Sequence, residues 1–317
     1  MSEIITDYEV AIVGGGPGGL TAGLYCARAT RKTVIFEKYL VGGQIANTDL
    51  VEDYPGFESI DGRELADKMS AHAKKFGVEN VADEVTDIWN EGDFKMLATA
   101  SGKLYQVKAV ILSTGGSPNK LGVDGEERLY GKGVSYCAIC DGAFFKGQVL
   151  AVVGGGDAAL EEGGFLTKYA SKVYLIHRRD EFRAAKIVQE RAKANPKMEM
   201  VLNSVVESVN GENRVESVTV KNVKSGEVRD IPVGGVFPFI GFTPNSNVTR
   251  EELKKDSGGY IITDDHMQTS IPGIFACGDV RSQLVRQITN AVGDGTTAAV
   301  AAEHHIEAIE DKLRVKV

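Results

Sequence analysis

The sequence predicts an α/β fold in which two doubly wound, three-layer domains share one chain, the second domain being inserted into the first. Two repeats support this prediction. A glycine-rich loop that follows an apolar strand and opens a helix occurs at residues 14–19 and again at 154–159. A turn with proline and asparagine, preceded by an apolar strand, occurs at 115–119 and again at 241–245.

The first glycine loop has the sequence GGGPGG and follows the apolar strand Val10 to Val13. Glycines at these positions let the chain turn tightly and let backbone N–H groups approach a pyrophosphate at the positive end of a helix dipole. Glu37 ends the next strand, where a carboxylate accepts hydrogen bonds from ribose hydroxyls and repels a 2′-phosphate. The loop is therefore typical of FAD. The expected contacts in the loop are Gly14, Gly16, Pro17 and Gly19.

The second loop has the sequence GGGDAA and follows the apolar strand Val149 to Val153. The position that corresponds to Glu37 is occupied by a histidine, and two arginines follow it. Clustered arginines attract a 2′-phosphate and bind it bidentately, so this loop predicts NADPH. One such loop is a weak signal, but two in the same strand-loop-helix context are far more specific. The expected contacts are Gly154, Gly156, Asp157, Ala158, His177, Arg178 and Arg179.

The proline and asparagine turns place the joints between the domains. They follow the apolar strands Ala109 to Leu112 and Gly235 to Ile240, and such turns suit a chain that leaves one sheet. We expect a discontinuous FAD domain, residues 1–118 and 247–317, around an inserted NADPH domain, residues 119–246, both Rossmann-like. The other expected elements are mixed strands at Phe94 to Thr99 and Val215 to Val223, a closing strand at Gly273 to Ala276 and a terminal helix from about Thr296 to Leu313.

Length, composition and charge exclude several classes of protein. The 317 residues allow about two domains, and 43% apolar with 25% charged residues is ordinary for a soluble protein. No apolar run approaches the ~18 residues of a membrane span, and residues 1–9 lack the pattern of a signal peptide. We therefore expect a cytoplasmic protein that does not bind membranes. The net charge of −8 also disfavours nucleic acid as a partner.

A Cys-x-x-Cys sequence, Cys137 to Cys140, lies shortly before the second glycine loop. Such a pair either binds metal or cycles between dithiol and disulfide. Four cysteines in a cytosolic chain argue against structural disulfides, and a metal site would need two further ligands at suitable spacing. Because no second pair exists, a redox pair without metal is the better interpretation. The remaining candidate ligands are expected in structural places, buried for Cys26 and Cys277 and at the surface for His304 and His305.

Several motifs together resemble those of the low-molecular-weight thioredoxin reductases of bacteria and archaea, which are homodimeric flavoproteins. The resemblance covers nearly the whole chain, including its length and its insertion pattern. The motifs that carry it are GGQ at 42–44, CAICDG at 137–142, HRRDEFRA at 177–184, GD at 278–279 and RQ at 286–287.

The resemblance implies a path for electrons from NADPH through FAD to a disulfide of Cys137 and Cys140, and from the dithiol to thioredoxin. By analogy, Cys140 is the sulfur next to the flavin and Cys137 attacks the thioredoxin disulfide. Asp141 is then the candidate general acid that protonates a departing thiolate. If the family resemblance is set aside, Asp141 is better explained as a turn residue, because an aspartate before a glycine is common in turns. The family also implies a homodimer.

Further contacts are implied in the same way. At the 2′-phosphate, Arg183 joins Arg178 and Arg179. Glu161 resembles the family glutamate near the nicotinamide, although a solvated helix face shared with Glu162 explains it equally well. The remaining implied FAD contacts are Gly43, Gln44, Asp53, Val85, Thr114, Gly115, Asp279, Arg286, Gln287 and Ile288.

The resemblance also implies motion. In this family the redox pair lies buried on the flavin while it is reduced, so the same arrangement cannot present Cys137 to a protein substrate. We therefore hypothesise that the inserted domain rotates, with the turns near Asn119 and Asn245 as hinges.

Three alternatives remain. A flavoprotein of the same build could reduce a peroxiredoxin or a glutaredoxin-like protein, or could use another electron donor, although the arginines near 178–183 argue against donors other than NADPH. A non-catalytic nucleotide or redox sensor would have no need of the cysteine pair. A structural zinc protein is less favoured still, because the second pair of ligands is absent from the sequence.

Overall fold

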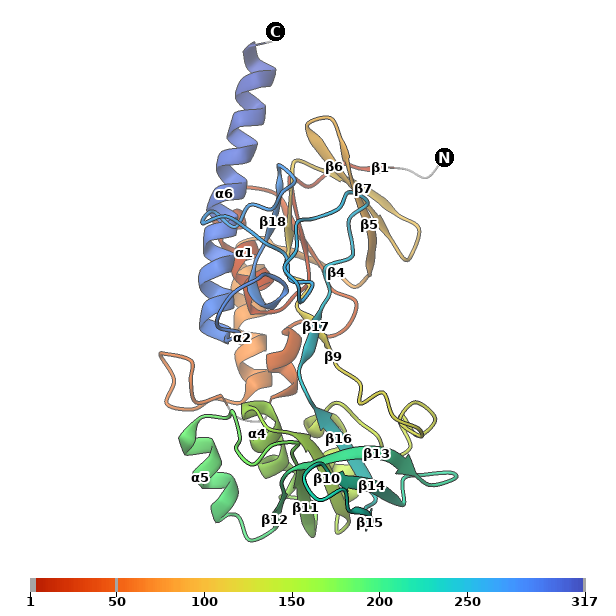
Figure 1. The fold of residues 1–317 in the computed structure, drawn as a ribbon. Helices are drawn as coiled ribbons and strands as arrows, with labels where there is room; N and C mark the ends of the chain where they lie inside the picture. Colours follow the sequence, from red (N-terminus) through yellow and green to blue (C-terminus); the bar gives the residue numbers. More distant parts are fainter. Residues whose placement is uncertain (1–3, 49–50, 316–317) are drawn as a thin grey trace. The chain divides into compact units, whose positions relative to one another are not determined.

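The computed structural model describes residues 4–48 and 51–315, so the first three residues of the N-terminal segment lie outside it (Figure 1). The chain forms two compact units, one of Met1–Ser117 with Thr243–Val317 and one of Pro118–Phe242. These joints lie one residue and four residues before the two predicted ones. At the two crossings the chain forms a two-stranded sheet, β9 (Gly116–Pro118) with β17 (Phe242–Pro244).

The parallel sheet of the first unit is buried on both faces. In β2, Val10 and Ile12 belong to one core while Ala11 and Val13 belong to the other, because successive side chains of a strand point to opposite faces. All neighbouring strands in this sheet are parallel. In spatial order they are β18 (Ile274–Ala276), β8 (Ala109–Leu112), β2 (Val10–Val13), β3 (Thr33–Phe36) and β4 (Glu79–Val81).

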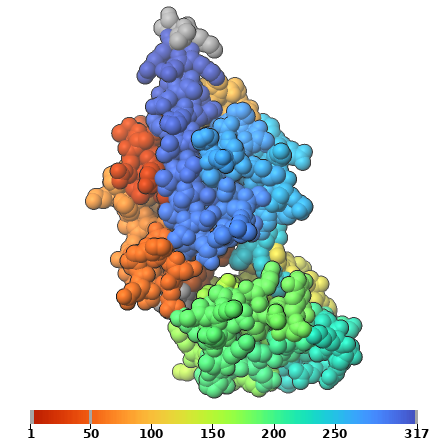
Figure 2. Space-filling model, turned by 60° about the vertical axis from the view of Figure 1, so that its left-hand side comes forward, coloured from red at the N-terminus to blue at the C-terminus, as the bar shows by residue number. Residues whose placement is uncertain are grey.

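Helices supply one of these cores and a second sheet supplies the other (Figure 1). The helices are α1 (Pro17–Arg28), α2 (Gly62–Lys75) and α6 (Ile288–Val315). The second sheet has the order β1 (Ile4–Ile5), β7 (Leu104–Val107), β6 (Phe94–Thr99) and β5 (Val85–Glu91). Figure 2 shows α6, in dark blue, along an exposed face of this unit. Among the described residues, none of the helices combines the length and the apolar character that a bilayer span requires.

The terminal helix begins at Ile288 and not near Thr296, so the predicted start was wrong. Glycines at 293 and 295 lower helix propensity and hide this first part of the helix in the sequence. Packing overrides propensity here, because a Cβ at Gly295 would overlap the backbone carbonyl oxygen of Gly18 in α1. Glycine thus lets the two helices approach closely. The other predicted strand ends agree with the structure within about two residues.

The second unit repeats the plan on a smaller scale. Its parallel sheet has the order β12 (Met198–Val201), β11 (Lys172–Ile176), β10 (Val149–Gly154) and β16 (Gly235–Phe239). One core packs α3 (Ala138–Asp141), α4 (Asp157–Leu166) and α5 (Lys186–Ala194) against Leu150 and Val152. The other core joins Ala151 and Val153 to an antiparallel sheet of β13 (Ser204–Asn210), β14 (Ser217–Asn222) and β15 (Val228–Pro232).

One of the paired histidines of α6 is not at the surface. His304 is exposed, as predicted, but His305 is half-buried with its ring edge-on to Phe275 at 6.2 Å between centroids. Its Nε2 atom is buried and has no hydrogen-bond partner among the described residues. Burial lowers the pKa of His305, and the charge of Lys95 lowers it further. The prediction was wrong for His305 because neighbouring helix positions differ by about 100°, and one of the two then faces the core.

A network of charged side chains ties α6 to the start of the parallel sheet. Arg31 pairs with Glu9, Glu303 and Glu310 at 3.0, 2.8 and 2.9 Å. Lys108 pairs with Glu9 and Glu310 as well, at 3.0 and 2.6 Å. The side chains of these pairs are only 14% to 26% exposed. Removing Arg31 would therefore leave Glu303 without its partner among the described residues, and Glu9 and Glu310 with Lys108 alone, in a poorly solvated place.

We expect Arg31→Met to lower the free energy of unfolding by about 3 kcal/mol, since it breaks three partly buried pairs at once.

The hydrogen bonds of Lys108 and then Arg31 lower the pKa of Glu310 below the ordinary 4.5. A depressed carboxylate pKa stabilises the fold at pH values above 4.5 and loses its effect as the pH falls through the folded-state pKa. Urea unfolding at several pH values should thus show a steeper acid-side loss for the unmodified protein than for Glu310→Gln, and parallel curves would contradict this.

Candidate active site

Backbone geometry makes glycine necessary in the first glycine loop. Gly14 has φ +104°, and a Cβ there would overlap the carbonyl oxygen of Ser113. A Cβ at Gly19 would overlap the carbonyl oxygen of Gly14 itself. Gly16 then caps α1, whose first residue is the proline that favours a helix start. The free N–H groups of this helix end are therefore open to an anion such as a pyrophosphate.

A pocket of about 570 Å³ lies beside this loop, entirely within the first unit. Gly14, Glu37, Val85 and Thr114, four of the predicted FAD contacts, line it together. The Glu37 carboxylate is held in place because its two oxygens accept the N–H groups of Gly15 and Tyr39, both at 2.9 Å. The pocket thus presents an oriented carboxylate beside the glycine loop, as recognition of a ribose requires. Asp83, Lys38 and residues 243–248, which also line the pocket, escaped the sequence analysis.

The segment 42–44 lies against the same loop. The N–H of Gly42 donates to the carbonyl oxygen of Gly15 at 2.8 Å, and a Cβ on Gly43 would come within 3.0 Å of the Gly16 Cα. Gln44 follows in the 3₁₀ helix η1 (Gly43–Asn47), where it is exposed. Asp53 is exposed too, and Gly115 accepts the N–H of Asn245 at 3.0 Å.

Two acidic side chains meet where the closing strand ends. Asp279 lies in the 3₁₀ helix η3 (Gly278–Val280), and burial raises its pKa above the usual range. Asp294, from α6, accepts the N–H of Gly278 at 3.1 Å and lies 3.6 Å from Arg281. No described residue donates a hydrogen bond to the Asp279 carboxylate, which suits a group that contacts a ligand. Asp294 was missed because it lay in the part of α6 that the sequence concealed.

The neighbouring predicted contacts follow η3. Arg286 lies with its guanidinium carbon 3.9 Å from the centroid of the Tyr260 ring, which fixes its direction. Arg286 and Gln287 are exposed, and Ile288 is the partly buried first residue of α6. All three lie in the first unit, with the pocket and the first glycine loop.

The second glycine loop is built on the same principle in the other unit. Gly154 has φ +155°, and a Cβ there would overlap the carbonyl oxygen of Phe239. The ring of His177 lies directly beneath Gly155, leaving no room for a side chain on that residue. His177 is 7% exposed and its Nε2 lies 3.0 Å from the carbonyl oxygen of Glu181. Burial, together with the nearby arginine charges, lowers the pKa of His177, so its ring is a neutral support for the loop.

The arginines after His177 are exposed, and none of the residues that the structure describes pairs with their guanidinium groups. The backbone holds them beside the loop, since the N–H of Arg183 donates to Gly155 at 2.7 Å. Asp157 adds a second link, because its carboxylate accepts the N–H of Ala185 at 2.7 Å. Three unneutralised cations next to a glycine loop can bind a phosphate dianion. The exposed side chains are Arg178, Arg179 and Arg183, with Ala158 and Glu161 exposed on α4.

Cys137 and Cys140 form a disulfide with their Cα atoms 5.3 Å apart. Cys137 caps α3, and its Sγ accepts the N–H of Cys140 at 3.2 Å. In the dithiol form this hydrogen bond would favour the Cys137 thiolate. Asp141 closes the short helix one residue after the exposed Cys140. No group of three or more candidate metal ligands occurs within residues 4–48 and 51–315.

The other two cysteines are free and buried, as predicted. Burial raises the pKa of both Cys26 and Cys277 to about 12, so neither is a reactive thiol. The disulfide is therefore the redox-active group of the chain. The fold and this site together define a disulfide oxidoreductase that works with two dinucleotides.

Comparisons with known proteins agree with this class. The model of the pyridine nucleotide-disulphide oxidoreductase family matches residues 8–295. Thioredoxin reductase of Bacillus subtilis is 46% identical over 314 residues, which cover 97% of each chain. Thioredoxin reductase of Listeria innocua is 45% identical over 310 residues, covering 98% of this chain and 97% of the relative. The crystal structure of Lactococcus lactis thioredoxin reductase matches with a TM-score of 0.92 and 45% identity, over 95% of this chain and 99% of that one.

The chain belongs to the low-molecular-weight thioredoxin reductases, a branch of the pyridine nucleotide-disulphide oxidoreductase family. The predicted family and fold class, two Rossmann-like domains with one inserted, are thereby confirmed. The protein is an NADPH-dependent flavoprotein oxidoreductase, and its cofactors are FAD and NADPH. The residues present fit both groups, since Gly16 and Gly156, where the two helices start, have no atom closer than 3.9 Å to the position that a side chain would occupy.

We expect Gly14→Ala to yield protein that holds less than about a tenth of the normal FAD, because the new Cβ must displace the Ser113 carbonyl and distort the loop. Absorbance of the released flavin per chain measures this. Gly92→Ala is the matched control, since Gly92 also has a positive φ, +64°, but has open space around its Cβ position. Full flavin content in Gly14→Ala would contradict the assignment of the first loop.

Proposed function

We propose that the protein reduces the disulfide of a thioredoxin with electrons from NADPH. The observation that carries this proposal is the disulfide of Cys137 and the exposed Cys140, in the same unit as a glycine loop and three exposed arginines that pair with none of the described residues. A protein disulfide can reach such a pair, whereas the thiols of Cys26 and Cys277 are shielded. When bound, FAD takes two electrons from NADPH and passes them to a disulfide.

The first unit would hold FAD and the second NADPH, so that the domains are residues 1–118 with 247–317 and residues 119–246. Glu37 would bind the adenosine ribose of FAD, while Asp279 would bind its ribityl and phosphate region. The support for this division is the pocket at Glu37 in one unit and the exposed arginines in the other. The other proposed flavin contacts are Gly43, Gln44, Asp53, Gly115, Arg286, Gln287 and Ile288.

In this proposal the arginines at 178, 179 and 183 bind the 2′-phosphate of NADPH, and Glu161 lies near its nicotinamide. Cys140 accepts electrons from the flavin side, and Cys137 attacks the thioredoxin disulfide as thiolate. Asp141 supplies the proton that a departing thiolate needs. The hydrogen bond from the Cys140 N–H to Cys137 Sγ supports the role of Cys137 as the nucleophile.

The proposal includes a cytoplasmic homodimer. The two free thiols are typical of a reducing compartment, and the resemblance to the homodimeric thioredoxin reductases favours a dimer. Sedimentation of the FAD-loaded protein tests the dimer, since a single species of one-chain mass would contradict it. Rotation of the inserted domain is part of the same proposal, and cross-linking the domains should stop multiple turnover while sparing a single half-reaction.

The central experiment is NADPH consumption by the purified, FAD-loaded protein with a disulfide thioredoxin. We expect steady oxidation of NADPH and the appearance of two thiols per NADPH consumed. If NADPH reduces the flavin but thioredoxin stays oxidised, the thioredoxin assignment fails. Assays with a peroxiredoxin and a glutaredoxin would then identify the class of disulfide protein that is the substrate.

A further inference from the structure

Glu126 is a buried carboxylate outside the site described so far. It is 1% exposed, and it lies in the second unit between β9 and the redox pair. Three donors bind it, the N–H of Leu121 at 2.7 Å, the N–H of Gly122 at 2.7 Å and the hydroxyl of Tyr136 at 2.6 Å. A buried carboxylate with this many donors is a rigid junction, because each donor loses the one partner that it has among the described residues if the carboxylate moves.

The loop that carries Glu126 packs tightly against the antiparallel sheet. Gly125 lies so close to β13 that a Cβ would overlap the carbonyl oxygen of Val209. The N–H of Val209 in turn donates to the carbonyl oxygen of Asp124 at 2.9 Å. The loop that carries Glu126 therefore cannot shift without breaking its seat on the antiparallel sheet.

Tyr136 links the Glu126 carboxylate to the redox pair, because Tyr136 directly precedes Cys137 in the chain. On the other side, Ser135 donates its N–H to Val236 of β16 at 3.0 Å, and its hydroxyl contacts both the N–H and the carbonyl of Cys137, at 3.1 and 3.2 Å. The backbone of Cys137 is thus tied to the parallel sheet through Ser135 and to the antiparallel sheet through the Tyr136 hydroxyl.

The hydroxyl of Tyr136 remains a donor at neutral pH. Burial raises the pKa of Tyr136 well above its usual range, and the hydrogen bond and charge of Glu126 raise it further. A short bond to a buried carboxylate keeps this side chain in one place, which preorganised sites require.

We infer that Glu126 and Tyr136 are positioning residues for the disulfide. Through the backbone of Cys137 they hold the two sulfur atoms in the position in which the disulfide is reduced. This inference rests on the proposed function, and it concerns only the step in which the Cys137 to Cys140 disulfide is reduced. It predicts a selective defect, since neither side chain belongs to the glycine loop or to the arginine cluster.

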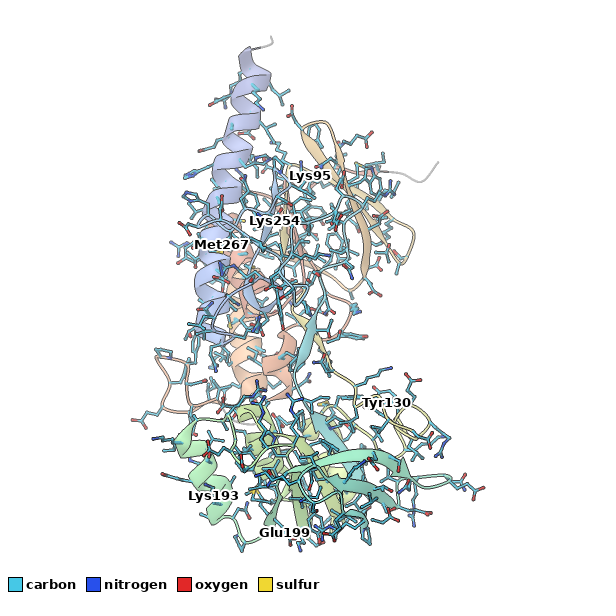
Figure 3. The ribbon with its side chains drawn as sticks, in the orientation of Figure 1. Lys95, Tyr130, Lys193, Glu199, Lys254 and Met267 are labelled. Atoms are coloured by element: carbon cyan, nitrogen blue, oxygen red, sulfur yellow. A yellow bond between two sulfur atoms is a disulfide. The ribbon has the colours of Figure 1, made fainter. Side chains whose placement is uncertain are left out.

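Tyr136→Phe removes the hydroxyl alone. In stopped-flow with NADPH, we expect the rate of flavin reduction to stay the same and the rate of disulfide reduction to fall about tenfold, because a small displacement of reacting atoms is costly. The kcat with thioredoxin should fall, while kcat/KM for NADPH, which reports on flavin reduction, stays constant. Tyr130→Phe is the matched control, because Tyr130 lies 5.8 Å from the Tyr136 ring and is 63% exposed on its loop (Figure 3).

Glu126→Gln is the second variant, which keeps the side-chain shape but weakens the acceptor, and its defect should have the same pattern. Equal slowing of both half-reactions, or a lowered Tm with both rates intact, would overturn the inference. Failure of the proposed function gives a different result. In that case the unmodified protein leaves thioredoxin oxidised, while the rate at which NADPH-reduced flavin opens the disulfide still reports on Tyr136.

Discussion

Replacement of Cys140 with serine is expected to lower thioredoxin reduction by a factor of about 10³ or more, while NADPH still bleaches the flavin. The disulfide of Cys137 and Cys140 is the only exit for electrons in the proposed path. Serine cannot form it, because its oxygen does not exchange with a disulfide. Two measurements test this: the rate of NADPH oxidation with thioredoxin in excess, and the loss of flavin absorbance when NADPH is added without oxygen.

Cys26→Ala is the matched control for this experiment. Cys26 is a free cysteine whose side chain is buried in the core between α1 and the parallel sheet. It therefore cannot act as a nucleophile toward a protein disulfide. The control should keep its turnover with thioredoxin and lose only some stability, as small core truncations do. Thioredoxin reduction by Cys140→Ser at the normal rate would refute the disulfide path.

Replacement of both Arg178 and Arg179 with glutamine is expected to lower kcat/KM for NADPH by about 10²-fold and to leave kcat/KM for NADH nearly constant. Only NADPH has the 2′-phosphate that these cations would bind. Both guanidinium groups are exposed, and no described residue neutralises them, so their charge is available to a ligand. The neutral ring of the buried His177 cannot replace them.

Lys172→Gln is the control for the arginine variant. Lys172 begins the same strand, β11, but lies at the end opposite Arg178 and pairs with Glu199. Loss of its charge should affect both nucleotides equally and weakly, which separates a local contact from a general change of field. An equal loss of NADPH and NADH activity in the arginine variant would contradict the 2′-phosphate assignment.

The glycine loops could be predicted because their requirement is local. Gly14 and Gly154 adopt backbone angles that other residues avoid, and the strands before them are short apolar runs, so the sequence records both features directly. The redox pair was equally visible, since four cysteines left few other pairings. These features depend on residues that are neighbours in the chain.

The features that escaped prediction depend on tertiary packing. Glu126 reaches Tyr136 across a loop, and Asp294 reaches Gly278 from another element, so no spacing in the sequence points to either pair. The ring of His177, a residue predicted to contact the nucleotide, also packs against Gly155 and supports the loop, which the sequence does not show. The early start of α6 was concealed because Gly293 and Gly295 lower helix propensity, and the close approach of α6 to α1 that Gly295 allows is a tertiary contact.

The two buried thiols have a consequence for the selectivity of this chemistry. Because burial raises the pKa of Cys26 and Cys277 to about 12, both thiols stay protonated at neutral pH. A protein that repeatedly meets oxidised partners is thereby insulated from forming stray mixed disulfides with them. Cys26 and Cys277 do not take part in thiol–disulfide exchange, so that exchange is confined to the Cys137 and Cys140 pair at the start of α3.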